Sequence, residues 1–380
     1  MERSAAPWSK MPLKLHDDRV WRTYAGGKSL DAWRGAEVPQ DSDRPELWVS
    51  STVKAVNAGR EHLPDEGMSK AVLPDGTAMP LKELIEADPV DFLGARHSAA
   101  YQSSPAILVK LLDSCERLTI QVHPDREFAK REFNSRFGKT EAWYILGGRT
   151  IDGQKPYVLL GFKEHVIKES WRLVFEEQRI PDMLNMLHKV EVEEGDVFLI
   201  TGGLPHAIGS GCFLIEIQEP TDLTLRTERT TPRGVPLRDA ACHQGIGFDR
   251  MLECFHYDRS DLEGALRRSK VMPEILAEHD GGRLTALIQA KHTDRFRMNR
   301  LAVSGTYTLE KPDEFTAAIV VSGKGTLEWA NEDAHNGGIG RIEVKRGETL
   351  FLPAGLRAMT WSNAPDSEEL IIVLCYPPHG

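Results

Sequence analysis

The stretch VEVEEGDVFLITGGLPHAIGSGCFLIEI, residues 190–217, decides the fold of this chain. Apolar and polar residues alternate in its first four positions, and an acidic glycine turn at 194–196 leads into the apolar run 197–200. A Gly/Pro turn then precedes a further apolar run at 212–217. Short strands divided by glycine and proline turns are typical of a β-sandwich or barrel and not of a parallel α/β sheet. The sequence therefore predicts a mainly β protein.

The same succession of elements returns near the C-terminus. Residues 341–348, RIEVKRGE, again alternate and end in a glycine turn, and the apolar run 350–352 and Pro353 follow. The first copy carries His206 directly after its proline, whereas no His, Asp or Glu stands close to Pro353. Similar units in one chain indicate an internal repeat. We therefore predict two related β-sandwiches, of which the second is structural.

Two segments have helical character. Apolar residues recur at helical spacing in residues 165–188, and the stretch 248–272 has a similar texture. We interpret the first as a helical insertion between strands and the second as a connection between the sandwiches. The predicted N-terminal catalytic domain spans residues 1–250, with the helical insertion at about 124–188. The helical connection and a C-terminal domain without metal ligands are predicted at 251–380.

The composition bounds the class of protein. The chain has 380 residues and a formal net charge of −10 at pH 7, with 41% hydrophobic and 27% charged residues, as in an ordinary globular protein. Nucleic-acid and anionic-membrane binders need broad basic patches, which this acidic balance disfavours. A few local cations can still hold a phosphorylated small substrate.

The cysteines and the N-terminal sequence indicate the cellular compartment in which we expect the protein. The five cysteines are widely spaced and form no CxxC pair, which disfavours a disulfide framework and a cysteine-based zinc finger. The N-terminus has no apolar core of the kind that a secretory signal needs, and no apolar run approaches the roughly 20 residues that span a bilayer. We expect a cytoplasmic monomer or homodimer with a small-molecule partner and no nucleic-acid or membrane partner.

The stretch LTIQVHPD, residues 118–125, begins the densest set of chemistry-bearing side chains. Alternation along a strand places Gln121 and His123 on one face, where an amide oxygen and an imidazole can reach one ion. Glu141 follows on another expected strand, and His206 stands in the Gly/Pro turn. This set suits zinc, and nickel, cobalt and manganese accept the same ligands. In the alternative interpretation, Gln121 lies on a solvated strand face and Glu141 forms a surface ion pair.

Several motifs, in this order along the chain, resemble those of type I phosphomannose isomerases of the cupin superfamily. They are PELWVS at 45–50, PAILVK at 105–110, LTIQVHPD at 118–125, GKTEAWY at 138–144, Gly195-Asp196 through Pro205-His206, and Glu216-Ile217-Gln218 through Arg226. That family's fold is a pair of cupin-type jelly rolls with a helical insertion. The resemblance therefore implies a mainly β chain of two jelly-roll β-sandwiches with an inserted helical segment.

The resemblance also implies an active site. The implied metal ligands, which hold one zinc ion per chain or another divalent metal, are Gln121, His123, Glu141 and His206. The implied catalytic residues are Arg226 and Lys139. The residues implied to approach the substrate are Lys110, Thr119 and Glu216.

The implied reaction interconverts mannose 6-phosphate and fructose 6-phosphate through an enediol. Such an isomerisation moves a proton between C1 and C2, and a divalent cation stabilises the negative charge that develops on the sugar oxygens. A base must carry the proton, and the candidates are a metal-bound hydroxide, Lys139 and Glu216. Arg226 stays protonated and suits contacts with the oxyanion or the phosphate.

Three other functions are open. The chain departs from the family at residues 227–234, TERTTPRG, so it can be an isomerase of a different sugar phosphate. A non-catalytic cupin that binds a sugar phosphate is a second, although a pure binder does not need the metal. A cupin oxygenase is a third, and it is disfavoured because those enzymes carry a His-x-His pair where this chain has Gln121 and His123.

Overall fold

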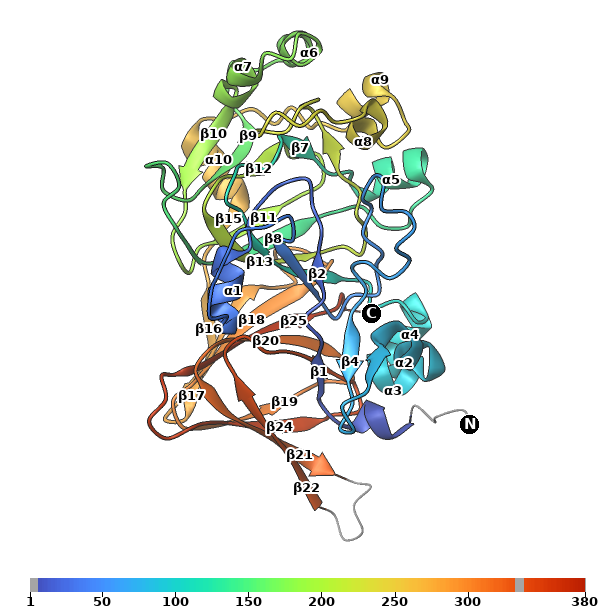
Figure 1. Cartoon of the computed structure of the whole chain (residues 1–380), viewed down its shortest axis with the longest axis vertical. Coiled ribbons are helices and arrows are strands. Elements are labelled where there is room, and N and C mark those ends of the chain that lie inside the picture. Colours follow the sequence, from blue (N-terminus) through green and yellow to red (C-terminus); the bar gives the residue numbers. More distant parts are fainter. Residues whose placement is uncertain (1–5, 332–337, 380) are drawn as a thin grey trace.

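The computed structural model describes residues 6–331 and 338–379 of the chain. Figure 1 shows two β-rich units stacked along the long axis, with teal and green strands in the upper unit and orange and red strands in the lower one. Most of the secondary structure is strand, so the predicted mainly β class is confirmed. No helix in the described ranges is long and apolar enough to cross a membrane.

The upper unit is a sandwich of two antiparallel sheets. The seven-stranded sheet consists, in spatial order, of β15 (Lys270–Val271), β11 (Val197–Ile200), β8 (Glu141–Gly148), β13 (Cys212–Gln218), β6 (Leu108–Asp113), β3 (Glu46–Val49) and β2 (Arg19–Val20). The five-stranded sheet consists of β10 (Leu187–Glu191), β9 (Tyr157–Phe162), β12 (His206–Ile208), β7 (Gln121–Val122) and β14 (Leu225–Arg226). The two sheets enclose the candidate site described below.

The lower unit is also a sandwich of two sheets. The nine-stranded sheet consists of β16 (Glu274–His279), β17 (Gly282–Ile288), β18 (Arg297–Val303), β25 (Leu370–Tyr376), β20 (Thr316–Ser322), β23 (Thr349–Leu352), β1 (Leu13–Leu15), β4 (Lys70–Val72) and β5 (Ala78–Pro80). The four-stranded sheet consists of β19 (Thr306–Glu310), β24 (Ala358–Asn363), β21 (Lys324–Asn331) and β22 (Gly338–Lys345). Strands β1, β4 and β5 come from the N-terminal part of the chain, and Figure 1 shows β1 and β4 in blue beside the lower sheets.

The strand order shows an internal repeat. The run β11-β8-β13-β6 in the upper unit has the same order as β23-β20-β25-β18 in the lower unit. The facing run β10-β9-β12-β7 likewise matches β22-β21-β24-β19. Strands β6 to β13 and β18 to β25 are therefore two jelly rolls of one topology. The repeat that the sequence indicated at 190–200 and 341–352 corresponds to β10–β11 and β22–β23.

Short helices connect the strands and cover the ends of the sheets. Along the chain they are a 3-10 turn (Ala6–Lys10), α1 (Lys28–Arg34), α2 (Leu81–Ala87), α3 (Pro89–Leu93), α4 (Ala95–Tyr101), α5 (Arg126–Phe133), α6 (Lys168–Glu176), α7 (Ile180–Asn185), α8 (Asp239–His243), α9 (Phe248–Leu252) and α10 (Leu262–Ser269). The segment expected as a helical insertion, about 124–188, holds α5, then β8 and β9, and then α6 and α7. Its helices thus form two groups separated by strands of the sandwich.

One hydrophobic core joins the two units. It contains Val109 and Ile215 of the upper seven-stranded sheet together with Ile319, Phe351 and Val373 of the lower nine-stranded sheet. All five side chains are fully buried. The outer face of the upper sheet therefore packs on the lower unit, and its inner face is left to build a pocket.

Replacing Phe351 with alanine is expected to lower the free energy of unfolding by about 3–5 kcal/mol, because it leaves a cavity in this shared core. The Phe351 ring stacks on Phe315 with 5.4 Å between ring centroids. Chemical denaturation measures the change, and Val38→Ala, at a side chain that is 70% exposed, is the control. Equal stability of the two variants would contradict a core shared by the units.

Candidate metal centre and active site

The five-stranded sheet aligns three of the expected site residues. In its register, His206 on β12 pairs with Gln121 on β7, and Gln121 pairs with Arg226 on β14. Residues paired in this way point to the same face of a sheet. Gln121 thus shares a face with His206 and Arg226. The strand that carries it is limited to Gln121–Val122.

The seven-stranded sheet aligns a second row. In its register, Lys110 on β6 lies between Trp48 on β3 and Glu216 on β13, and Glu216 is followed by Trp143 on β8. These side chains share a face because they are paired across neighbouring strands. This row lies across the sandwich from the row of His206, because members of both rows line one pocket.

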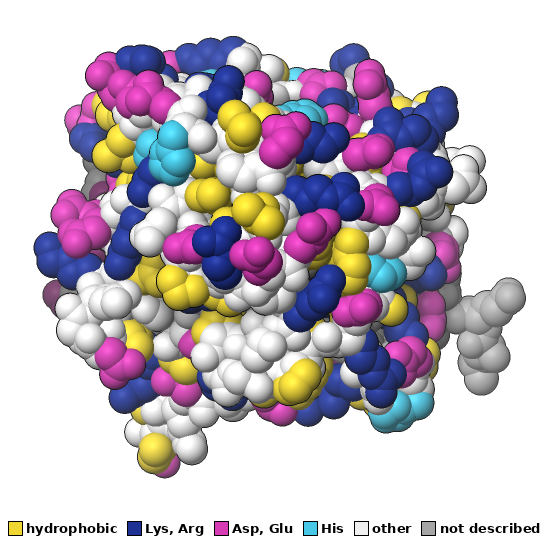
Figure 2. Space-filling view, turned by 90° about the horizontal axis from the view of Figure 1, so that it is seen from above, with side chains coloured by type: hydrophobic (Ala, Val, Ile, Leu, Met, Phe, Trp, Pro, Cys, Tyr) yellow, Lys and Arg dark blue, Asp and Glu magenta, His cyan; other side chains and the backbone are white. Residues whose placement is uncertain are grey.

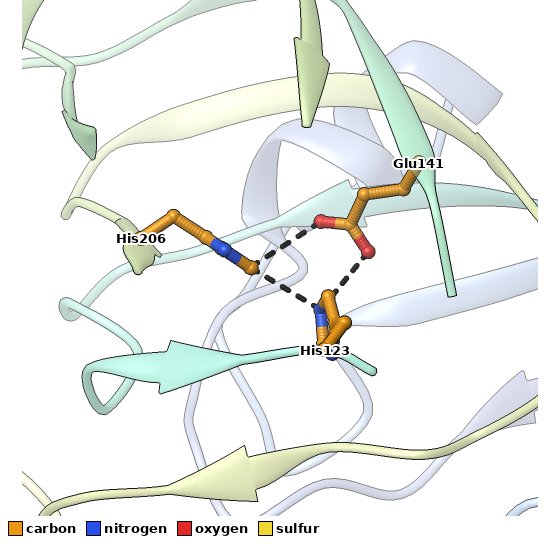
Figure 3. Close-up of side chains that lie close together, drawn as sticks. All are labelled: His123, Glu141 and His206. Carbon is orange, nitrogen blue, oxygen red and sulfur yellow. Dashed lines mark hydrogen bonds and ion pairs between the residues drawn. The ribbon is translucent and has the colours of Figure 1, made fainter. Parts of the chain in front are cut away.

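Between the two rows, three buried side chains converge on one point (Figure 3). The Nε2 atom of His123 lies 3.1 Å from Oε2 of Glu141 and 3.2 Å from Nε2 of His206. The His206 Nε2 atom lies 3.5 Å from Oε1 of Glu141. All three ligand atoms lie within 4.8 Å of one another. Two imidazoles and a carboxylate at these distances form the kind of ligand set that zinc and similar divalent metals accept.

A backbone carbonyl oxygen next to the Nδ1 atom of each histidine fixes the tautomer of the ring. The Nδ1 atom of His123 lies 2.9 Å from the carbonyl oxygen of Leu223, and that of His206 lies 2.9 Å from the carbonyl oxygen of Leu204. A carbonyl oxygen only accepts, so each Nδ1 carries the proton and each Nε2 presents its lone pair. Metal-binding histidines in proteins are commonly held in this way.

Electrostatics keep both rings neutral. Burial and the neighbouring Lys139 charge lower the pKa of His123 to about 3. Burial also lowers the pKa of His206. Burial alone would raise the pKa of Glu141, but the neighbouring Lys139 charge opposes this effect, and that pKa lies well below its usual value. Two neutral imidazoles then face each other with lone pairs 3.2 Å apart beside a carboxylate, an arrangement that a cation relieves.

Lys139 and Gln121 lie next to the triad of His123, Glu141 and His206. The Lys139 Nζ atom lies 2.7 Å from His123 Nε2 and donates to Glu141 Oε2 at 2.8 Å. The side-chain amide nitrogen of Gln121 lies 3.2 Å from His206 Nε2, and a half-turn of the amide brings its oxygen to this position. Of the four expected metal ligands, three thus form the cluster and Gln121 lies against it.

Trp143 orients the carboxylate of the triad. Its indole N–H donates to Glu141 Oε1 at 3.0 Å, and its ring packs edge-on against His206. Trp143→Phe keeps the ring and removes this donor, and partners of this kind typically change metal affinity by about 10- to 100-fold. We expect zinc affinity, measured by competition with a chelator, to fall by about 10-fold or more. An unchanged zinc affinity would mean that the indole only packs in the core.

A pocket of about 280 Å³ adjoins the triad. It is lined by all the other site residues that the sequence suggested, namely Lys110, Thr119, Gln121, Lys139, Glu216 and Arg226. The structure thus brings the whole expected set together from six separate stretches of chain. Arg226 donates to the carbonyl oxygen of Ala241 at 3.0 Å.

Lys110 and Glu216 form a buried ion pair in the pocket wall. The Lys110 Nζ atom donates to Glu216 Oε1 at 2.9 Å, and it lies 5.1 Å from the centre of the Trp48 ring. Burial and the nearby Glu141 carboxylate raise the pKa of Glu216. A buried carboxyl group of raised pKa takes up a proton more readily than an ordinary one, which suits acid–base chemistry.

A second buried network lies beside this ion pair, with Arg22 and Lys110 both over the Trp48 ring, and the sequence analysis missed most of it. Arg22 donates to Glu46 at 2.9 Å and to Asp222 at 3.2 Å, and the Tyr24 hydroxyl donates to Glu46 at 2.6 Å. The Arg22 charge helps to lower the pKa of Asp222 to about 2 against the opposing effect of burial. The PELWVS motif pointed to Glu46, but no spacing in the sequence links Arg22 to Asp222.

Among known proteins, the chain is similar to mannose-6-phosphate isomerases. No protein-family model matches the chain. Mannose-6-phosphate isomerase ManA of Bacillus subtilis is 27% identical over 265 residues, which cover 66% of this chain and 70% of the relative. Mannose-6-phosphate isomerase of Streptococcus mutans is 24% identical over 294 residues, which cover 75% and 81%.

The fold is likewise similar to solved structures. The crystal structure of the mannose 6-phosphate isomerase from Bacillus subtilis superposes with a TM-score of 0.71 at 20% identity, covering 96% of this chain and 99% of that one. A putative mannosephosphate isomerase from Archaeoglobus fulgidus gives a TM-score of 0.69 at 19% identity. The resemblance to type I phosphomannose isomerases and the fold that it implied are confirmed.

Proposed function

We propose that this chain is a metal-dependent aldose–ketose isomerase that interconverts mannose 6-phosphate and fructose 6-phosphate. The observation that carries the proposal is the buried triad His123, Glu141 and His206 beside a pocket with acid–base and cationic side chains. The similarity to mannose-6-phosphate isomerases supports the choice of substrate.

The triad suits zinc, with Gln121 as a fourth ligand through its amide oxygen. A ligand set of two imidazoles, a carboxylate and an amide leaves access for substrate in a catalytic site. A bound divalent metal would supply positive charge against the negative charge that develops on the enediol oxygens. The carbonyl partners of both histidines hold the Nε2 lone pairs in place before substrate arrives.

Other side chains of the pocket are suited to transfer the proton and to bind the sugar phosphate. Glu216 and Lys139 are the two candidates for carrying the proton between C1 and C2, since both line the pocket beside the triad. The buried ion pair of Lys110 and Glu216 fixes the position of that carboxylate. Thr119 and Arg226 offer a hydroxyl and a guanidinium to sugar or phosphate oxygens.

A coupled assay tests the proposal. Purified protein is incubated with mannose 6-phosphate while fructose 6-phosphate is followed, with and without a chelator. We expect product formation that the chelator stops and added zinc restores. Metal-loaded protein that forms no product from mannose 6-phosphate would refute the proposal. Turnover of another sugar phosphate, or binding without turnover, would then identify one of the alternative functions.

We make further proposals on the compartment, the partners, the domain boundary and the oligomeric state. Five free cysteines support a reducing, cytoplasmic compartment. Figure 2 shows basic and acidic side chains interspersed over the upper face, which supports a small-molecule partner in place of nucleic acid. We propose a domain boundary at residue 250, although β1, β4 and β5 from the N-terminal part of the chain pair within the C-terminal unit. We also propose a monomeric or homodimeric state.

A further inference from the structure

The cations that line the pocket fall into two groups. Four of them are matched by a carboxylate in hydrogen-bond contact, and the pairs are Arg22 with Glu46, Lys110 with Glu216, Arg117 with Glu228, and Lys139 with Glu141. The other two, Arg226 and Arg238, have no carboxylate within ion-pair distance among the residues that the structure describes. Among the described residues, Arg226 and Arg238 are therefore the cations of this pocket that have no carboxylate in direct contact.

Arg226 and Arg238 lie at the same place. Both line the pocket beside the triad and also the adjoining pocket of about 780 Å³. The Arg226 guanidinium donates to the carbonyl oxygen of Ala241, and the Ala241 N–H donates in turn to the carbonyl oxygen of Arg238 at 2.8 Å. One short segment thus accepts a hydrogen bond from the Arg226 guanidinium and carries Arg238.

The two arginines lie closer to the surface than the residues beside the triad, an arrangement that suits an elongated substrate. Gln121 and Lys139, next to the triad, are buried, whereas Arg238 is exposed and Arg226 is intermediate. The triad therefore lies at the floor of the pocket and Arg238 at its mouth. In a hexose 6-phosphate, the reacting carbons C1 and C2 stand at one end and the phosphate at the other.

We propose that Arg238, together with Arg226, binds the phosphate group of the substrate at the mouth of the pocket. The inference rests on the proposed function and names the residue that selects a phosphorylated sugar over a free one. A phosphate ester carries about two negative charges near neutral pH and offers three acceptor oxygens. Two guanidinium forks match that charge and that geometry.

The partly buried Arg226 adds a physical reason. Burial lowers the pKa of Arg226, which shows that its charge is poorly solvated where it stands. A poorly solvated cation is stabilised when an anion binds beside it, because the folded protein already carries the free-energy cost of dehydrating that cation. Arg238 supplies the second contact and, being exposed, contributes little to folding.

The test compares binding of fructose 6-phosphate and of fructose to the metal-loaded protein by calorimetry. In Arg238→Gln we expect the Kd of fructose 6-phosphate to rise by about 10- to 100-fold, as for a lost charged hydrogen bond, and the Kd of fructose to stay unchanged. Arg238→Lys should recover part of the loss. Arg250→Gln, which removes a cation from α9 that pairs with Glu132 outside both pockets, should bind both sugars as the wild type does.

The outcomes separate this inference from the proposed function. Unchanged binding of fructose 6-phosphate in Arg238→Gln, or an equal loss for fructose, would overturn the role of Arg238. A wild type that binds fructose 6-phosphate but forms no mannose 6-phosphate would refute the isomerase. In that case a selective loss in Arg238→Gln would still support the phosphate site.

Discussion

Replacing His123 with alanine is expected to remove the metal and to lower kcat by more than about 10³-fold, since the charge on the enediol then loses its main stabilisation. His123 supplies one of the three converging ligand atoms, and its Nε2 lies 3.1 Å from Glu141 and 3.2 Å from His206. Two ligands and an amide do not make a closed set for zinc. Elemental analysis of the purified variant, together with the isomerase assay, measures both effects.

His188→Ala is the matched control. His188 is also buried, and its Nε2 atom contacts the carbonyl oxygen of Ser260, away from the triad. The control should keep one metal per chain and most of its activity, with only a loss of stability. If His123→Ala retained the metal and the activity while folded, the triad would not be the catalytic centre.

Arg226→Ala should leave the metal in place and still lower kcat/KM by about 10²- to 10³-fold, because it removes a guanidinium that the pocket cannot replace. Arg226 lies on β14 beside Gln121, so it faces the pocket without contacting any of the three triad residues within hydrogen-bond distance. Metal content, steady-state kinetics and thermal stability are measured on the same preparation.

Arg229→Gln serves as the control for a lost arginine in the same stretch. Arg229 packs over the Phe248 ring at 4.4 Å and lines neither pocket. It should retain near-normal kcat/KM. Normal turnover in Arg226→Ala would refute a role for this residue in the reaction and would remove Arg226 from the phosphate site.

The sequence was most informative where alternation and turns coincide. The runs expected at 190–193, 197–200 and 212–217 correspond to β10, β11 and β13. Strands β11 and β13 are buried along their whole length, which explains their apolar runs, whereas β10 is partly exposed, which explains its alternation. His206 follows Pro205 at the start of β12, and this turn brings its ring to the triad.

The sequence was least informative at an exposed edge. The sequence analysis predicts no strand directly after the helical stretch 248–272, yet β16 and β17 form a hairpin at 274–288. Every residue of β16 is exposed, so no burial pattern marks it as a strand. Asp280 and Gly281, at the turn, were the available signal, because Asp-Gly is a favoured hairpin turn.

Contacts between distant parts of the chain also escaped prediction. Strand β1 pairs with β23 across more than 300 residues, and Arg22 meets Asp222 in the pocket wall. Such pairs depend on how distant stretches of the chain pack together within each unit. Local pattern carries no information about that packing, whereas strand alternation sufficed to align the side chains of each row.

Diffraction from crystals loaded with zinc and fructose 6-phosphate, with anomalous data at the zinc edge, tests the central claim most directly. The expected result is one zinc peak at about 2.0–2.2 Å from His123 Nε2, His206 Nε2 and a Glu141 oxygen, with the C1 and C2 oxygens of the sugar facing it. A zinc peak elsewhere, or a sugar whose C1–C2 end points away from the triad, would contradict the account.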